Sequence, residues 1–218
     1  MDFGSFGSVQ NLFKSAKKKL PSLSMHDTVL WMSGQSAYTK HRRVSKKHFL
    51  RRKVVALGIM DVFCCDLIDA QSIKNVNSGY AYILSIVDLF SRFAFVKKLR
   101  KKTTMEVGAA FEDVFNEIKD VPLAIWSDRG SELTSLSQKI FKEFGIRHYF
   151  VDSPLHATVV ERFNKTYELK LFKLMTARNS LRYIDFMQEI VDGINNRPSR
   201  ALFGATPKEV FRRACMIL

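Results

Sequence analysis

Three apolar segments rich in β-branched and aromatic residues follow one another between residues 54 and 99. The first, VVALGIMDVFCCDLIDA, predicts a strand at about residues 59–68, and YAYILSIVDLF and SRFAFVKKL predict two more. The short Ser-Arg step between the last two indicates a hairpin, so the three strands form an antiparallel meander. The segment SIKNVNSGY contains Asn and Gly, and it predicts a loop between the first two strands.

After the meander, helical and strand patterns alternate. Thr103 or Thr104 is a predicted N-cap for a helix with apolar residues at spacings of three and four. The segment LAIWSD predicts a fourth strand, SELTSLSQKIFKEF a helix that ends near Gly145, and IRHYFV a fifth strand. Three further helices are predicted in HATVVERFNKTYELKL, LRYIDFMQEIVDGINN and, after an N-cap at Thr206, TPKEVFRRA. Because the helix between strands three and four is a crossover, we expect an α/β fold in which helices flank a five-stranded mixed sheet: the meander plus two parallel strands.

The positive charge of the chain is concentrated at its N-terminal end. The net charge is +14, and the first 53 residues hold twelve Lys and Arg but only two acids. We predict a basic, largely flexible arm over residues 1–53, with no regular element before residue 25 and a short helix or docking segment at residues 25–39. A folded core follows at residues 54–215. The basic excess indicates a nucleic-acid partner, and the expected DNA-contacting residues of this arm are Arg42, Arg43, Lys46, Lys47, Arg51, Arg52 and Lys53.

Several protein classes are disfavoured by composition. Apolar residues make up 46% of the chain, which favours a packed core over disorder. We find no apolar run of membrane-span length and no signal-peptide core, so no membrane partner is expected. The three cysteines form neither a disulfide framework nor a zinc cluster. We therefore expect an intracellular protein, and the segment RRVSKKHFLRRK is also typical of a nuclear-import signal.

Three carboxylates fall at comparable positions in the predicted fold. Asp66 lies within the first strand, Asp128 at the end of the fourth strand, and Glu161 near the start of the helix after the fifth strand. If the first and fourth strands are parallel neighbours, Asp66 and Asp128 converge, and the helix with Glu161 can pack across that edge. The alternative for Glu161 is an ordinary acidic residue that the helix dipole favours. Other acids that compete for these roles are Asp61, Asp69, Asp88 and Asp152.

Converging carboxylates repel one another unless cations neutralise them. Oxygen ligands without His or Cys favour Mg²⁺ or Mn²⁺. Two such ions, roughly 3.5–4 Å apart, activate the attacking oxygen and stabilise the leaving oxygen of a phosphodiester. A basic chain with this set of acids therefore indicates phosphoryl transfer on nucleic acid, with Mg²⁺ or Mn²⁺ as the cofactor and two ions in the site.

Four ordered motifs carry a family resemblance over about three quarters of the chain. The segments DLIDAQ with the following hairpin, IWSDRGSEL, VVERFNKT and NNRP…GATPKEV resemble the catalytic core of retroviral-type integrases and DDE transposases, which has a ribonuclease H-like fold. The segment AYTKHRR, which leads into the core, is similar to integrases of Maverick/Polinton-type elements and retrotransposons. Between Asp128 and Glu161 lie 32 residues, slightly fewer than is usual in the family.

The resemblance implies DNA cutting and joining: hydrolysis at the 3′ ends of an element, followed by attack of the new 3′-hydroxyl on target DNA. Asp66 and Asp128 would each bind both ions, and Glu161 would bind one. The resemblance also implies a homo-oligomer, with element ends and target DNA as partners. The family's N-terminal zinc module has no counterpart here, and His156 stands where the family usually has Lys. The DNA contacts implied around Glu161 come from His156, Arg162, Asn164 and Lys165.

Two other functions remain open at this stage. The first is an integrase-derived protein that binds DNA without cutting it. It remains open because the flanking modules of the family are not recognised in this sequence. A nuclease of the ribonuclease H type is the second, since the expected fold and metal site are shared. For Lys165 the alternative is a solvated surface lysine without a DNA contact, and for Arg162 the alternative is a structural salt bridge.

Overall fold

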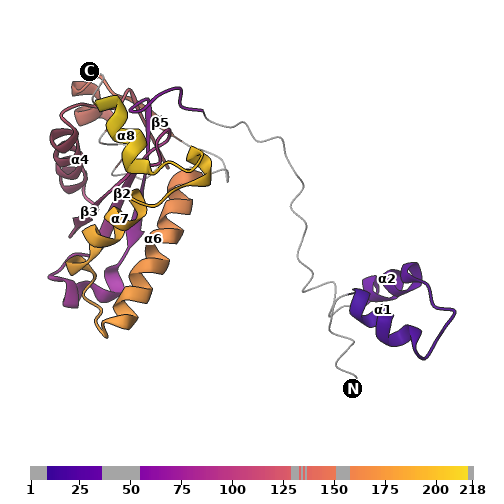
Figure 1. Ribbon diagram of the computed structural model, residues 1–218. Coiled ribbons are helices and arrows are strands. Elements are labelled where there is room, and N and C mark those ends of the chain that lie inside the picture. Colours follow the sequence, from indigo (N-terminus) through magenta and orange to yellow (C-terminus); the bar gives the residue numbers. More distant parts are fainter. Residues whose placement is uncertain are drawn as a thin grey trace. The chain divides into compact units, whose positions relative to one another are not determined.

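The computed structural model describes residues 9–35, 55–128, 137–150 and 158–215, together with residues 133 and 135 (Figure 1). The chain divides into two compact units, Met1–Leu50 and Arg51–Leu218. None of the described helices has both the length and the apolar character needed to cross a bilayer. The predicted site residues that lie outside the described residues are Arg42, Arg43, Lys46, Lys47, Arg51, Arg52, Lys53 and His156.

The N-terminal unit contains two helices, α1 (Val9–Lys17) and α2 (Met25–Ser33). The predicted helix around residues 25–39 is confirmed as α2, which begins with a capping box between Ser24 and Asp27. The prediction of no regular element before residue 25 is wrong, because α1 is present. Its partly buried residues, Val9, Leu12, Phe13 and Ala16, follow helical spacing that the surrounding Gly, Ser and Lys residues obscure.

The core unit is built on one five-stranded sheet with the order β3-β2-β1-β4-β5. β1 pairs antiparallel with β2, and β2 with β3, whereas the β1–β4 and β4–β5 pairs are parallel. The predicted meander plus two parallel strands is confirmed. The strands are β1 (Val62–Asp69), β2 (Tyr82–Asp88), β3 (Ala94–Leu99), β4 (Ala124–Ser127) and β5 (Arg147–Phe150).

Helices cover both faces of this sheet, with α4 on one side and α6 and α7 on the other (Figure 1). The N-caps predicted at Thr103 and Thr206 are confirmed, since their hydroxyl oxygens accept from Glu106 N–H and Glu209 N–H. The helices are α4 (Thr104–Ile118), α6 (Thr158–Ala177), α7 (Met187–Asn195) and α8 (Pro207–Cys215). The short 3₁₀ turns are η2 (Gln71–Asn77), η4 (Tyr183–Asp185) and η5 (Arg200–Leu202).

Two local predictions differ from the structure. The segment expected to be a loop between the first two strands forms the 3₁₀ turn η2, in which Asn77 donates to Ile73 O and Leu181 O. The helix predicted before Gly145 is present in its described part, with α-helical residues at 133, 135, 142 and 143, but it contains a π-helical turn, η3 (Ser137–Phe141). Gly145 does end it, with φ +69°. Periodicity predicts a helix here but does not determine which helical hydrogen-bond pattern forms.

Alternation along β1 separates two apolar cores. Cys64 and Ile68 pack toward α6 and α7, whereas Phe63 and Cys65 pack toward α4. Asp66 therefore lies on the face covered by α6, as the alternation of side chains predicts. The edge of the sheet is tied to α7, because the Asn195 amide donates to Ala94 O at 2.8 Å and accepts from Ala94 N–H at 2.9 Å.

Candidate active site

Asp66 on β1 and Asp128 just after β4 lie at the same level of the sheet. The predicted parallel pairing of these strands is confirmed, with Cys64 opposite Trp126. Continuing this register by two residues brings Asp66 level with Asp128. Since functional groups gather at the carboxyl ends of parallel strands, this end of the sheet is the candidate site.

A pocket of about 240 Å³ lies beside the two aspartates. Its described lining combines acidic, basic, aromatic and apolar side chains from β1, β2, the β3–α4 connection and the segment after β4. These residues are Asp66, Leu67, Asp69, Tyr82, Lys102, Asp128 and Leu133. The pocket is large enough for a small polar group or for part of a nucleotide.

The ionisation of Asp66 shows that further acids are close. Burial raises the pKa of the Asp66 carboxyl, and a hydrogen bond from Leu67 N–H (2.8 Å) opposes this effect. The charges of Asp128 and Glu161 raise the pKa further, whereas a hydrogen bond from Asn164 lowers it. All three predicted catalytic carboxylates thus interact electrostatically at one place.

Helix α6 packs against β1 and supplies both Glu161 and Asn164. Glu161 is exposed in the first turn of α6, while Asn164, one turn later, is only 7% exposed. The Asn164 amide nitrogen donates to Asp66 at 2.9 Å. Its carbonyl oxygen is buried and has no hydrogen-bond partner among the described residues. The side chain of Asn164 is thus a buried partner of Asp66, and the DNA contact predicted for Asn164 stays a prediction.

The described competing acids have structural contacts. The Asp61 carboxylate accepts from Leu57 N–H and Gly58 N–H, each at 2.7 Å, and closes a turn. Asp69 accepts from the backbone and side chain of Gln71, each at 2.8 Å. Asp88 is fully buried beneath the β2–β3 hairpin. The fourth rival, Asp152, lies outside the described residues.

The donor set around Asp66 fits a divalent cation. Among the described residues, no three His, Cys, Asp or Glu side chains form a ready group for a metal ion. However, the three interacting acids offer only oxygen atoms, the ligands that Mg²⁺ and Mn²⁺ prefer. The unpartnered carbonyl oxygen of Asn164 lies on the same helix, one turn from Glu161. A bound cation, or a water molecule that it holds, would offset the repulsion between these acids and give the Asn164 oxygen a partner.

A buried hydrogen-bond chain lies behind Asp128. The Ser127 hydroxyl donates to Asp128 O at 2.8 Å, so it accepts from His148 Nε2–H, also at 2.8 Å. Burial lowers the pKa of His148 to about 4, so the imidazole is neutral at pH 7. Its ring lies between Phe141 and Phe150, with centroid distances of 5.2 and 4.2 Å. This chain links β5 to the end of β4 that carries Asp128.

Lys102 and Tyr82 line the pocket but were not predicted from the sequence as site residues. Tyr82 is opposite Asp69 in the β1–β2 pair and opposite Leu99 in the β2–β3 pair. The ends of β1 and β3 therefore lie at the same end of the sheet, close to the Asp66 site. A signal was present in the predicted meander, because any residue just after the third strand must lie near this end.

The predicted DNA contacts Arg162 and Lys165 are both exposed on α6. They flank the buried Asn164 in sequence, so the helix presents a basic surface next to the candidate site. Exposure is compatible with a phosphate contact, and the DNA roles of Arg162 and Lys165 stay predictions.

A larger groove, of about 370 Å³, lies between α6 and α7. Lys170, Lys173, Leu174 and Ile190 contribute to its lining. The only carboxylate among its described lining residues is that of Glu189, which pairs with Arg178 at 3.1 Å. Because the described lining of this groove brings no acids together, we do not assign the chemistry to it.

Comparisons with known proteins agree with this geometry. Residues 59–153 match the integrase core domain family. The transposon-derived protein F54H12.3 of Caenorhabditis elegans is 37% identical over 141 residues, which cover 64% of this chain and 49% of that protein. The Pol polyprotein of feline endogenous virus ECE1 is 29% identical over 147 residues, covering 66% of this chain and 14% of the polyprotein. The chain thus spans about half the length of the nematode relative and less of the viral one.

Two solved structures show the same fold at low sequence identity. The HTLV-2 integrase catalytic core domain in complex with magnesium, in its trimeric form, has a TM-score of 0.60 and 20% identity, covering 72% of this chain and 99% of that one. The simian T-cell lymphotropic virus intasome in complex with the PP2A regulatory subunit B56 gamma has a TM-score of 0.65 and 17% identity, covering 94% and 74%. The core unit thus has the fold of retroviral integrase catalytic cores, and its residues 59–153 are similar to the integrase core domain family.

Proposed function

We propose, from its integrase core, that this chain is a metal-dependent polynucleotidyl transferase that processes the 3′ ends of an element and joins them to target DNA. The observation that carries the proposal is that Asp66 and Asp128 lie level at the carboxyl ends of the parallel strands β1 and β4 and line one pocket, where the charge of Glu161 also raises the pKa of Asp66. The HTLV-2 core was solved with magnesium in dimeric and trimeric forms, and the simian relative in an intasome. On these grounds we include Mg²⁺, a homo-oligomer and DNA integration in the proposal.

In this proposal Asp66, Asp128 and Glu161 hold the divalent ions. When bound, Mg²⁺ makes the attacking water or 3′-hydroxyl more acidic and neutralises charge on the leaving oxygen. Asn164 positions Asp66, because its amide donates to one carboxylate oxygen of Asp66 while Leu67 N–H donates to the other. The chain of His148 and Ser127 restrains the backbone at Asp128.

The chain's positive charge supports DNA as the substrate. Arg162 and Lys165 extend from the helix that carries Glu161, so a bound duplex end would meet them on its way to the acids. The basic segment at residues 40–53 would add sequence-independent phosphate contacts. A nuclear location remains a prediction from that same segment.

A strand-transfer assay with labelled oligonucleotide ends and Mg²⁺ or Mn²⁺ tests the proposal. Asp66→Asn, Asp128→Asn and Glu161→Gln are expected to abolish product while the protein remains folded. Glu168→Gln is the matched control, because Glu168 lies two turns after Glu161 on the same helix. Activity that survives all three active-site substitutions would refute the assignment.

The same assay separates the two alternative functions. Salt-dependent DNA binding with no cutting or joining under any metal would identify a silent DNA-binding protein. Selective cleavage of the RNA strand of an RNA–DNA hybrid would identify a nuclease of the ribonuclease H type.

A further inference from the structure

The candidate active-site pocket contains a basic side chain that the proposed chemistry has not yet used. Of the described residues that line the pocket, only Lys102 is basic, and Asp66, Asp69 and Asp128 line the same pocket. Within the described part of the chain, no ion pair engages its ammonium group. A cation in the pocket of two converging acids either neutralises them or binds an anion that enters with the substrate.

The backbone around Lys102 is firmly held. The Glu106 carboxylate accepts from Arg100 N–H at 2.8 Å and from Lys101 N–H at 3.0 Å. Thr103, on the other side of Lys102, accepts from Glu106 N–H and begins α4. The connection from β3 to α4 is therefore fixed at both sides of Lys102 by one acidic residue. Such support keeps a long side chain close to the pocket at a low entropic cost.

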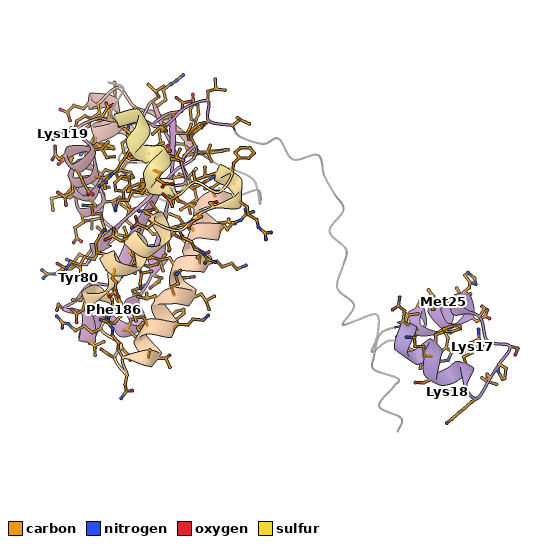
Figure 2. All side chains as sticks on the ribbon, viewed as in Figure 1. Lys17, Lys18, Met25, Tyr80, Lys119 and Phe186 are labelled. Atoms are coloured by element: carbon orange, nitrogen blue, oxygen red, sulfur yellow. The ribbon has the colours of Figure 1, made fainter. Side chains whose placement is uncertain are left out.

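Neighbouring basic side chains have other contacts. The cationic groups of Lys98 and Arg100 lie over the ring of Tyr80, at 4.8 and 5.1 Å from its centroid. Figure 2 marks the position of Tyr80 in the core unit. Lys101 is exposed and does not line the pocket. Among Lys98, Arg100, Lys101 and Lys102, only Lys102 is among the described residues that line the pocket with the acids.

Neutralising Asp69 is not a sufficient role for Lys102. Hydrogen bonds from the backbone and side chain of Gln71 are the main causes that lower the pKa of Asp69, and the charge of Lys102 adds only a smaller contribution after them. Asp69 would thus keep its principal partners without Lys102. The ammonium group is left available for a ligand of the pocket.

We propose that Lys102 binds a non-bridging phosphate oxygen of the DNA strand that occupies the Asp66 pocket. An ammonium group donates to phosphate as a compact point charge. The inference rests on the proposed function, since it takes the phosphodiester as the substrate of the pocket. Lys102 would attract a phosphate toward a site that is otherwise negatively charged, and it would fix the strand relative to the acids.

DNA binding of the full chain provides the first test. Fluorescence anisotropy with a labelled duplex end and Mg²⁺ is measured over a range of salt in an Asp128→Asn background, which prevents turnover. Lys102→Ala and Lys102→Gln should reduce the slope of log affinity against log salt by about 1. Lys102→Arg should keep the slope. Lys101→Ala is the matched control, and it should change the slope by less than half of the change that Lys102→Ala causes.

Strand transfer in the otherwise unaltered chain provides the second test. At DNA concentrations below saturation, Lys102→Ala should lower the rate about tenfold to hundredfold, as for loss of a charged hydrogen bond. Lys102→Arg should stay within about threefold, because the charge is kept. Thermal unfolding should be the same for all these variants, since Lys102 is exposed.

The two proposals fail in different ways. If Lys102→Ala and Lys101→Ala change the salt slope and the rate equally, Lys102 has no special phosphate contact and the inference is wrong. If Asp66→Asn inactivates the chain while Lys102→Ala behaves like the control, only the Lys102 inference fails. If the unaltered chain neither cuts nor joins DNA, the proposed function fails, and the salt slope still decides whether Lys102 binds phosphate.

Discussion

Asp66, which is half-buried, and Asp88, which is fully buried, are carboxylates on neighbouring strands, and burial raises the pKa of both. Asp88 is surrounded by donors: Ser91 N–H at 2.7 Å, the Ser91 hydroxyl at 2.5 Å and Met60 N–H at 3.2 Å. Asp66 has two donors, Leu67 N–H and the Asn164 amide, and meets the charges of two other acids beside a pocket. Burial of a carboxylate is therefore a poor guide to function. The better guide is whether the surrounding groups already satisfy its charge.

Exchanging each acid for its amide gives the largest expected contrast. Asp66→Asn should lower strand transfer by about a thousandfold or more, because ligands of a catalytic ion contribute several kcal/mol to the transition state. Its free energy of unfolding without metal should be unchanged or higher, since a repelling charge is removed. Asp88→Asn should lower the unfolding free energy by about 2–3 kcal/mol, because charge-assisted hydrogen bonds are lost. Comparable activity losses in the two folded variants would contradict the distinction.

Removing the donor that positions Asp66 should give the next largest effect. Asn164→Leu keeps most of the buried volume but leaves one Asp66 oxygen without its hydrogen bond. Loss of such a support typically reduces metal affinity or activity about tenfold to hundredfold. Titrating strand transfer with Mg²⁺ should show a higher midpoint for the variant. Thr166→Val, on the exposed side of α6, is the control, and an unchanged midpoint in Asn164→Leu would show that Asn164 has no positioning role.

The satisfied acid has its own supporting residue, and its loss should affect stability alone. Ser91→Ala removes the hydroxyl donor to Asp88 while the backbone donor at Ser91 remains. Loss of a hydrogen bond to a buried charge costs about 1–3 kcal/mol. Urea unfolding should detect this decrease, and strand transfer by the folded variant should match the unaltered chain. A decrease in the rate without a decrease in stability would mean that Asp88 also affects the catalytic site.

The pH dependence of the free energy of unfolding should distinguish His148 from Asp66 and Asp88. This is the smallest of the expected effects. The pKa of His148 is about 4 in the folded chain and near 6.5 in the unfolded chain. Its contribution to the free energy of unfolding is therefore present above pH 6.5 and is lost as the pH falls toward 4. Asp66 and Asp88 act in the opposite direction, because a raised pKa retains the proton in the folded state and their contribution decreases as the pH rises.

Urea unfolding between pH 7 and pH 4.5 measures the His148 effect. The unaltered chain should lose about 1 kcal/mol more than His148→Gln over this range, a value reduced for the partial exposure of the ring. Glutamine keeps a donor for Ser127 but does not titrate. Parallel pH curves for the two proteins would show that the imidazole is not held neutral by the fold.

The sequence predicted the sheet well because its signals are local. Alternating and apolar segments identified the five strands, and the helix at residues 104–118 made the first and fourth strands parallel, which brings Asp66 level with Asp128. The contact of Asn164 with Asp66 was not predicted, because it depends on how α6 rotates against β1. Lys102 was missed for a related reason. Its place in the pocket follows from the pairing of three strands and not from any pattern around it.

The contact of Asn195 with β3 has a consequence for how copies of this chain can assemble. β3 is an edge strand, and an exposed edge offers backbone groups to the strand of another molecule. At Ala94 both of those groups are already occupied by one amide side chain, which imitates a neighbouring strand. A second copy could extend the sheet at that point only by displacing α7. Assembly through helix surfaces leaves the fold intact, whereas growth of the sheet from copy to copy at this edge is blocked.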